Sequence, residues 1–102
     1  MVTKNVEIEW EGATHQVTVR NLTFGEKNQI EEDSIKFEYV ANQLRGIPRP
    51  TLMKEMYVVK GLVKAPFTIT RENIQKLQPW DGEKLYEIIG EISTIKDEKK
   101  SD

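Results

Sequence analysis

The sequence predicts an α+β fold, in which an N-terminal β-hairpin packs on a bundle of three to four α-helices. Three observations carry this prediction: alternating apolar and polar residues near the start, an apolar helical stretch over residues 51–65, and an amphipathic stripe over residues 85–95. With 102 residues the chain is long enough for one hydrophobic core without covalent staples. We therefore expect a single globular domain over residues 1–95.

The N-terminal segment has the pattern of a β-hairpin. Apolar and polar residues alternate over residues 6–10, which is the period of a half-buried strand. Glu11-Gly12 supplies the turn, because glycine takes a positive φ without penalty. The alternation returns from Ala13, so we predict strands at about residues 3–11 and 13–20. Because a lone hairpin is barely stable in water, its valine face must lie on the helices.

A helix start follows the hairpin. Thr23 has the residue type of an N-cap, and Glu26, three positions later, can accept a hydrogen bond from the amide of the cap residue. Ile30 is the first clear core residue of this segment. We predict a helix that runs to about Asp33.

The segment over residues 34–50 fits two structures. Alternation of apolar and charged residues over residues 35–39 favours a strand, whereas the spacing of Ile30, Phe37 and Leu44 fits a continued helix almost as well. We expect an irregular or short extended segment at 35–39, followed by a helical turn. A glycine and two prolines predict a loop over Arg45–Pro50.

The central helix is predicted to organise the core. Apolar residues recur at steps of three and four from Leu52 to Val63, and Tyr57, Val58 and Leu62 widen this apolar face. Pro50 stands just before the helix. Ala65-Pro66 ends it, because a residue before proline avoids the helical region.

Two further helices are predicted toward the end of the chain. Thr70 caps a short helix within residues 68–77 that turns Ile74 and Leu77 inward, and Asp81 can cap the last helix. Residues 96–102 contain no apolar side chain and are expected to form a disordered, charged tail. The apolar stripe of the last helix consists of Leu85, Ile88, Ile89, Ile92 and Ile95.

No residue pattern predicts catalysis, a cofactor site or a metal site, so we expect a protein that is not an enzyme. Cysteine is absent, and His15 stands alone as an ordinary edge histidine. Glu7, Glu9 and Glu11 share a strand face but lack the glycine-containing loop of calcium sites, which favours a solvated face. No window approaches the roughly 20 apolar residues of a membrane span. The start of the chain lacks the apolar run of a signal peptide, so we expect a cytoplasmic location.

Five residues are candidates for contact with a partner. Trp80 lies between a proline and a helix cap, where it either packs on the helix below or anchors a binding surface. Tyr57 and Val58 add apolar surface beyond what one helix face needs. Arg45 and Arg49 flank the predicted loop, where they either form ordinary surface charge or contact an acidic partner or a phosphate.

Three segments in a fixed order resemble the small tail assembly chaperones of long-tailed, siphophage-like viruses. The first is Asn21-Leu-Thr-Phe-Gly-Glu-Lys-Asn-Gln-Ile30, directly after a hairpin. The second ends the apolar helix and reads Val63-Lys-Ala-Pro-Phe-Thr-Ile-Thr-Arg-Glu-Asn-Ile74, followed by Leu77. The third is the amphipathic last helix. The resemblance covers residues 15–93, and this chain departs from it at Arg45–Pro50 and at Trp80.

The resemblance implies a non-enzymatic protein of the host cytoplasm that binds the tape-measure protein and promotes assembly of the tail-tube protein around it. It also implies a mostly helical protein that forms a homo-oligomer, with no catalytic residues to carry over. The alternatives are a small virion component, such as a head–tail connector or tail part, and a small nucleic-acid-binding regulator. A net charge of -2 without a basic stripe disfavours nucleic acid and an anionic membrane as partners.

Overall fold

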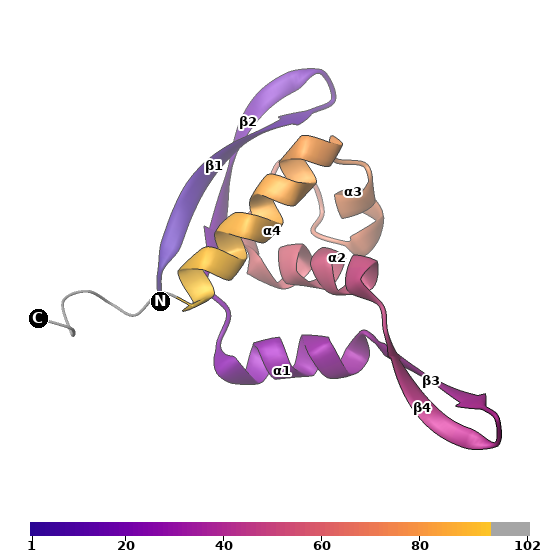
Figure 1. Ribbon diagram of the computed structural model, residues 1–102. Helices are drawn as coiled ribbons and strands as arrows, with labels where there is room; N and C mark the ends of the chain where they lie inside the picture. The colour runs from indigo at the N-terminus through magenta and orange to yellow at the C-terminus, as the bar shows by residue number, and fades with distance from the viewer. Residues whose placement is uncertain (95–102) are drawn as a thin grey trace, which may run out of the picture.

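The computed structural model describes residues 1–94 and shows an α+β fold with an N-terminal hairpin on helices (Figure 1). The α+β class and the packing of the hairpin are therefore confirmed. Ile95 and the predicted tail 96–102 lie outside the described residues. The elements in chain order are β1 (Thr3–Trp10), β2 (Ala13–Arg20), α1 (Phe24–Asp33), β3 (Ile35–Val40), β4 (Gln43–Pro48), α2 (Pro50–Gly61), β5 (Leu62–Lys64), α3 (Arg71–Gln75) and α4 (Pro79–Thr94).

The predicted N-terminal hairpin is confirmed. β1 and β2 pair antiparallel, with Trp10 opposite Ala13 across the turn. Glu11 and Gly12 have φ values of 51° and 77°, which is the conformation of the tight turns that join twisted strands. β5 pairs with the other side of β2, so the sheet has the order β1-β2-β5.

One core lies between this sheet and the helices. The inward side chains of β1 and β2 meet α4, whose Leu85 and Ile89 are fully buried. α2 packs on α4, and α1 and α3 flank α2. The buried apolar residues are Val6, Ile8, Val17, Val19, Leu22, Ile30, Tyr57, Val58, Leu62, Ile74, Leu77, Leu85 and Ile89.

The start of α1 is the predicted capping box. The Thr23 hydroxyl accepts from the Glu26 amide at 3.2 Å, and Glu26 accepts from the Thr23 amide at 3.0 Å. The helix runs to Asp33 as predicted and buries Ile30 completely. The cap of α3 is confirmed as well, since the Thr70 hydroxyl accepts from the Asn73 amide at 3.2 Å.

The predicted end of the central helix is wrong. α2 includes Pro50 as its first residue and ends at Gly61, and Leu62–Lys64 continue as β5 beside β2. A short apolar run fits a buried strand as well as a helix, so periodicity could not place this boundary. Pro50 fits the first helical position because the amide that proline lacks has no partner there in any helix.

Two predictions for residues 34–50 are wrong, namely the helical turn and the loop over Arg45–Pro50. These residues form a second hairpin, β3–β4, and only the extended segment at 35–39 is confirmed. Its turn consists of Ala41 and Asn42, with φ values of 51° and 65°. Alanine rarely takes this conformation, whereas asparagine does so more readily, so Asn42 was the one weak turn signal there.

The predicted cap of the last helix is also wrong. α4 begins at Pro79, and Asp81 lies in its first turn with a carboxylate that contacts β1. Leu85 and Ile89 are buried on the predicted stripe, and Ile88 and Ile92 are partly buried. Within the described residues, no helix has both the length and the apolar character needed to cross a membrane.

Candidate functional site

β3 and β4 form a two-stranded arm, defined here as residues 35–48, which leaves the body between α1 and α2 (Figure 1). The arm is a separate two-stranded sheet, and among residues 1–94 no third strand joins it. None of its residues is buried. A two-stranded hairpin becomes stable when further strands join its edge or a helix packs on its apolar face.

The register of the arm separates its side chains into two faces. Directly opposite residues of an antiparallel pair point to the same side. The apolar face therefore contains Ile35, Phe37, Tyr39, Leu44, Gly46 and Pro48, and the opposite, polar face contains Lys36, Glu38, Val40, Gln43, Arg45 and Ile47.

Charged and polar side chains pair with one another on the polar face, whereas large apolar side chains are exposed on the apolar face. On the polar face Lys36 Nζ lies 2.8 Å from Glu38 Oε1, and Arg45 Nη2 donates to Gln43 Oε1 at 3.4 Å. On the apolar face Phe37, Tyr39 and Leu44 are 65%, 78% and 60% exposed. These three side chains leave about 400 Å² of mostly apolar surface in water, the size of patch that is often functional on a monomer.

Gly46 leaves room for the Phe37 ring on the apolar face. It stands opposite Phe37, and a Cβ at this position would lie 3.3 Å from Phe37 Cε1 and 3.0 Å from Ile35 Cγ2. The Phe37 ring therefore covers the glycine backbone, and a larger residue would push the ring away. The arrangement keeps the aromatic side chain on the sheet surface.

Arg49 fixes the arm to the body. Its backbone amide donates to the Ser34 carbonyl at 3.0 Å, and its guanidinium donates to the carbonyls of Ser34 and Asp33 at 3.3 and 3.2 Å. These carbonyls lie at the C-terminal end of α1, where a cation is favourable. The contacts join the two ends of the arm, so Arg49 sets where the arm leaves the body.

The structure does not bring the predicted contact residues together. Tyr57 and Val58 are 7% and 2% exposed, so the expectation that they add free apolar surface is wrong. Tyr57 packs edge to face on Tyr86, with ring centroids 5.3 Å apart. The sequence could not show that α2 is covered on several sides. Arg45 lies in the middle of β4 on the polar face, and Trp80 is 60% exposed in the first turn of α4.

Charged side chains beside Trp80 cover part of the outer edge of β1. Asp81, only 2% exposed, accepts a hydrogen bond from the Glu9 amide at 2.8 Å through Oδ2. Lys84 Nζ donates to the Glu7 carbonyl at 2.6 Å and lies 3.4 Å from Asp81 Oδ1. α4 thereby satisfies strand groups that would otherwise be open to another chain.

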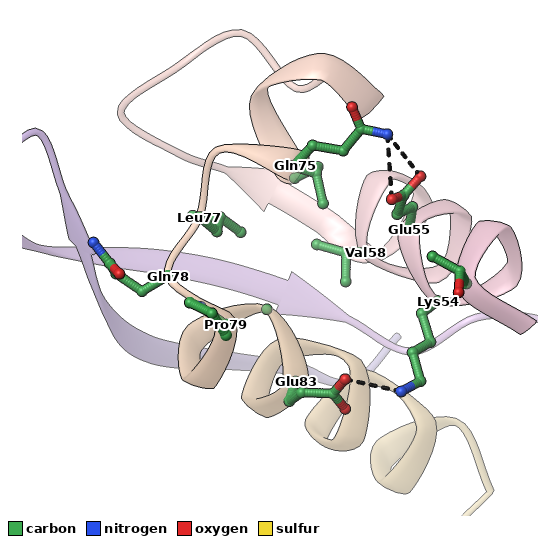
Figure 2. Close-up of a pocket in the computed structure, with 11 residues that line it drawn as sticks. Lys54, Glu55, Val58, Gln75, Leu77, Gln78, Pro79 and Glu83 are labelled. Carbon is green, nitrogen blue, oxygen red and sulfur yellow. Dashed lines mark hydrogen bonds and ion pairs between the residues drawn. The ribbon is translucent and has the colours of Figure 1, made fainter.

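A shallow pocket of about 180 Å³ lies between α2, α3 and α4 (Figure 2). Val58 and Leu77 contribute to its lining, and polar residues around them bond to one another: Gln75 donates to both Glu55 oxygens, and Lys54 pairs with Glu83 at 2.8 Å. Ligand pockets usually measure about 300–1,000 Å³. This one is small, and these rim groups already have partners.

The strongest electrostatic perturbation lies away from the arm. The guanidinium of Arg20 donates two hydrogen bonds to Glu26 and, with the Thr23 amide, lowers the pKa of that carboxyl to about 2. Burial raises the pKa of Tyr57. Within residues 1–94, no group of three or more candidate metal ligands gathers around His15, the Glu7–Glu11 face or any other point.

No protein-family model, curated protein or solved structure matches this chain. The candidate site therefore rests on the geometry of the arm. Sequence reasoning singled out none of Phe37, Tyr39 and Leu44 as contact residues. The signal that could have identified them was the alternation over residues 35–39, read as an exposed strand with one apolar face.

Proposed function

We propose that this chain is a non-enzymatic tail assembly chaperone of a virus, and that the apolar face of its arm holds an apolar segment of the tape-measure protein. The observation that carries the proposal is the exposure of Phe37, Tyr39 and Leu44 on one face of a projecting hairpin. The resemblance of three segments to such chaperones adds the class of partner. The tail-tube protein and further copies of this chain complete the proposed set of partners.

The size of the apolar face fits a reversible contact. Stable protein interfaces bury roughly 800 Å² on each partner, and the three exposed arm side chains offer about half of that. An assembly chaperone has to release its partner once the structure is built, so a contact of this size suits the role. Because exposed apolar surface of this kind also aggregates, a partner that covers it stabilises both proteins.

The test is co-expression with the tape-measure protein encoded in the same genome. Wild-type protein should keep the tape-measure protein in solution and purify with it. Phe37→Ser combined with Leu44→Ser should reduce the captured amount at least fivefold, because both changes remove apolar area from the contact. The matched control is Val40→Ser with Ile47→Ser, which removes similar side chains from the polar face of the same arm.

The control variant should capture the partner as wild type does. A tape-measure protein that stays insoluble beside the wild-type chain contradicts the proposal, and equal loss in both double variants contradicts the role of the apolar face. Trp80→Ala belongs in the same assay as the second exposed candidate contact. We expect it to reduce capture less than the arm variant does.

The second candidate function is a structural component of the virion. The observation that favours it is the same projecting arm, because a subunit of a ring or tube can place such a hairpin on its neighbour. The two functions differ in where the protein ends up. A structural component purifies with assembled particles, whereas a chaperone remains in the lysate after the particles are removed.

A further inference from the structure

The hydrogen bonds of the arm show which of its backbone groups point outward. Ala41-Asn42 form a two-residue turn, so Val40 and Gln43 exchange hydrogen bonds across it. Bonded and non-bonded pairs alternate along an antiparallel ladder. Ile35, Phe37 and Tyr39 are therefore in non-bonded pairs, and their amides and carbonyls point away from β4. In the described part of the chain these groups have no hydrogen-bond partner.

This free edge differs from the outer edges of β1 and β4. On β1 the outward groups of Glu7 and Glu9 are taken by Lys84 and Asp81 of α4. On the outer edge of β4, Pro48 has no amide to donate. On the outer edge of β3, Ile35, Phe37 and Tyr39 present all the backbone donors and acceptors that an additional strand needs. These three residues also carry large apolar side chains.

We propose that the outer edge of β3 pairs antiparallel with β3 of a second copy of this chain, about a two-fold axis at Phe37. Backbone groups that point outward on one β3 can bond only to backbone groups that point outward on the other. Phe37 therefore lies opposite Phe37 of the second copy, and Ile35 lies opposite Tyr39 of the second copy. Each of these pairs exchanges two hydrogen bonds. The product is a four-stranded sheet with the order β4-β3-β3-β4.

Charge complementarity supports a second copy in this register. The two-fold axis at Phe37 places Lys36 directly opposite Glu38 of the other chain, and Glu38 opposite its Lys36. A slip of two residues in one direction puts Lys36 opposite Lys36, and a slip in the other direction puts Glu38 opposite Glu38. Like charges directly opposite are destabilising, so the sequence of β3 favours one register over its neighbours.

The same pairing resolves the instability of the arm. A two-stranded hairpin is marginal in water, whereas a sheet of three or more strands with an apolar face can be stable on its own. In this register the apolar faces of both arms point to the same side of the sheet. They join into one continuous apolar surface. The pairing needs no tape-measure protein, and it gives a site and a register to the self-contact that the proposed function includes.

The experiment measures self-association of the purified full chain by sedimentation equilibrium at concentrations up to about 1 mM. Wild-type protein should form a dimer. Lys36→Glu and Glu38→Lys should each weaken the dimer about tenfold or more, because each places like charges opposite each other. A mixture of the two variants, and the chain that carries both changes, should dimerise more tightly than either variant alone. Recovery is not complete, because Glu38→Lys also places a positive charge opposite Arg45 within the arm. Lys60→Glu on the exposed surface of α2 is the matched charge control.

Amide hydrogen exchange locates the contact. In the wild-type dimer the outward amides of Ile35, Phe37 and Tyr39 should exchange slowly, and in the Lys36→Glu variant they should exchange fast. The amides of Glu38 and Lys36 itself are bonded within the hairpin, so they serve as the internal reference. Protection that does not differ between wild type and variant contradicts the pairing.

A wild-type chain that remains monomeric at about 1 mM overturns the proposal. Association that both charge variants leave unchanged, or a mixture that dimerises no better than either variant alone, overturns it as well. These readouts contain no tape-measure protein, so they are independent of the capture assay. A dimer that captures nothing contradicts the proposed function alone, and capture by a monomer contradicts this inference alone.

Discussion

Glu26 connects the end of β2 to the start of α1 through one carboxylate. It accepts two hydrogen bonds from Arg20, at 2.8 and 2.6 Å, and one from the Thr23 amide at 3.0 Å. These contacts favour the ionised form, so the pKa of Glu26 falls from about 4.5 to about 2 on folding. A carboxyl with a lower pKa in the folded state stabilises the fold above its unfolded pKa.

The first prediction is that Glu26→Gln flattens the acid side of the stability profile. The contribution of Glu26 is fully present above about pH 4.5 and is lost as the pH falls toward 2. Glutamine keeps the capping box but cannot ionise. Urea titrations from pH 7 to pH 2 should show a smaller decrease in the free energy of unfolding for the variant. Parallel curves for both proteins would contradict the assigned role of the ion pair.

Glu11 carries local strain in the turn between β1 and β2. Its φ of 51° is unfavourable for most residues with a side chain, whereas asparagine tolerates it. The second prediction is that Glu11→Asn stabilises the protein by about 0.5–1 kcal/mol, which raises Tm by a few degrees. Thr14→Asn, in an exposed part of β2, is the control and should lower Tm, because asparagine disfavours strands.

The contact between α2 and α4 depends on the absence of a side chain at Gly61. A Cβ there would lie 2.5 Å from Ile89 Cδ1 and 2.8 Å from Ile89 Cγ1. The two helices can therefore approach closely only with glycine at the end of α2. Leu62 follows Gly61 directly as the first residue of β5 and pairs with Val19 of β2.

The third prediction is that Gly61→Ala destabilises the fold by about 1–3 kcal/mol through overpacking. Combined with Ile89→Ala, it should cost less than the sum of the two single changes, because the smaller residue vacates the space. A double-mutant cycle from denaturant titrations measures this coupling. Additive effects would mean that the clash is relieved elsewhere.

The fourth prediction concerns β5. Leu62 is 6% exposed, so Leu62→Ala should lower the free energy of unfolding by about 2–5 kcal/mol. That loss is a large fraction of the stability of a domain of this size. Thermal melting is the measurement, and Val63→Ala, at a 52% exposed position of the same strand, is the control that should melt like wild type.

Sequence patterns predicted those elements whose signals are local. The capping box at Thr23, the cap at Thr70 and the Glu11-Gly12 turn depend on a few adjacent residues, and all three are confirmed. The cap predicted at Asp81 is also local but is wrong. The burial of Leu62 was predicted correctly, but its element was not. Periodicity shows which residues face the core. Residues 62–64 form a strand because β2 has a free side that they can pair with, and a local pattern does not show this.

Most of the candidate site could not be predicted from the sequence. The Ala41-Asn42 turn contains no glycine, and Asn42 alone is a weak signal, so the hairpin over residues 35–48 was not predicted. The exposure of Phe37 and the burial of Tyr57 depend on which surfaces other elements cover. In the sequence, both are aromatic residues within an apolar pattern, so the pattern does not distinguish them. Trp80 was the one predicted apolar contact residue that is exposed in the structure.

At the scale of the whole molecule, the arm and the body are separable. Every buried apolar residue of the described chain lies outside residues 35–48, and Figure 1 shows the arm projecting from the helices. The ends of the arm already meet, since the Arg49 amide donates to the Ser34 carbonyl at 3.0 Å. The body therefore needs the arm neither for its core nor for its chain path.

The fifth prediction is that replacing residues 35–48 with a short Gly-Ser turn leaves the body folded. Tm should stay within about 3 °C of wild type, because the removed residues bury no core surface. Circular dichroism melting measures this outcome. A large decrease in Tm would show that the arm stabilises α1 and α2 from outside the core.

Pro48 limits what such an arm can build. A sheet with two equivalent open edges adds copies without end and grows into a fibre. Here one edge is complete, and the other ends in a residue that cannot donate a hydrogen bond. In the proposed dimer, addition of a single copy uses the complete edge of both chains. In a concentrated solution, association should therefore stop at a particle of defined size, and the solution should stay fluid, although each free chain exposes an aromatic strand to water.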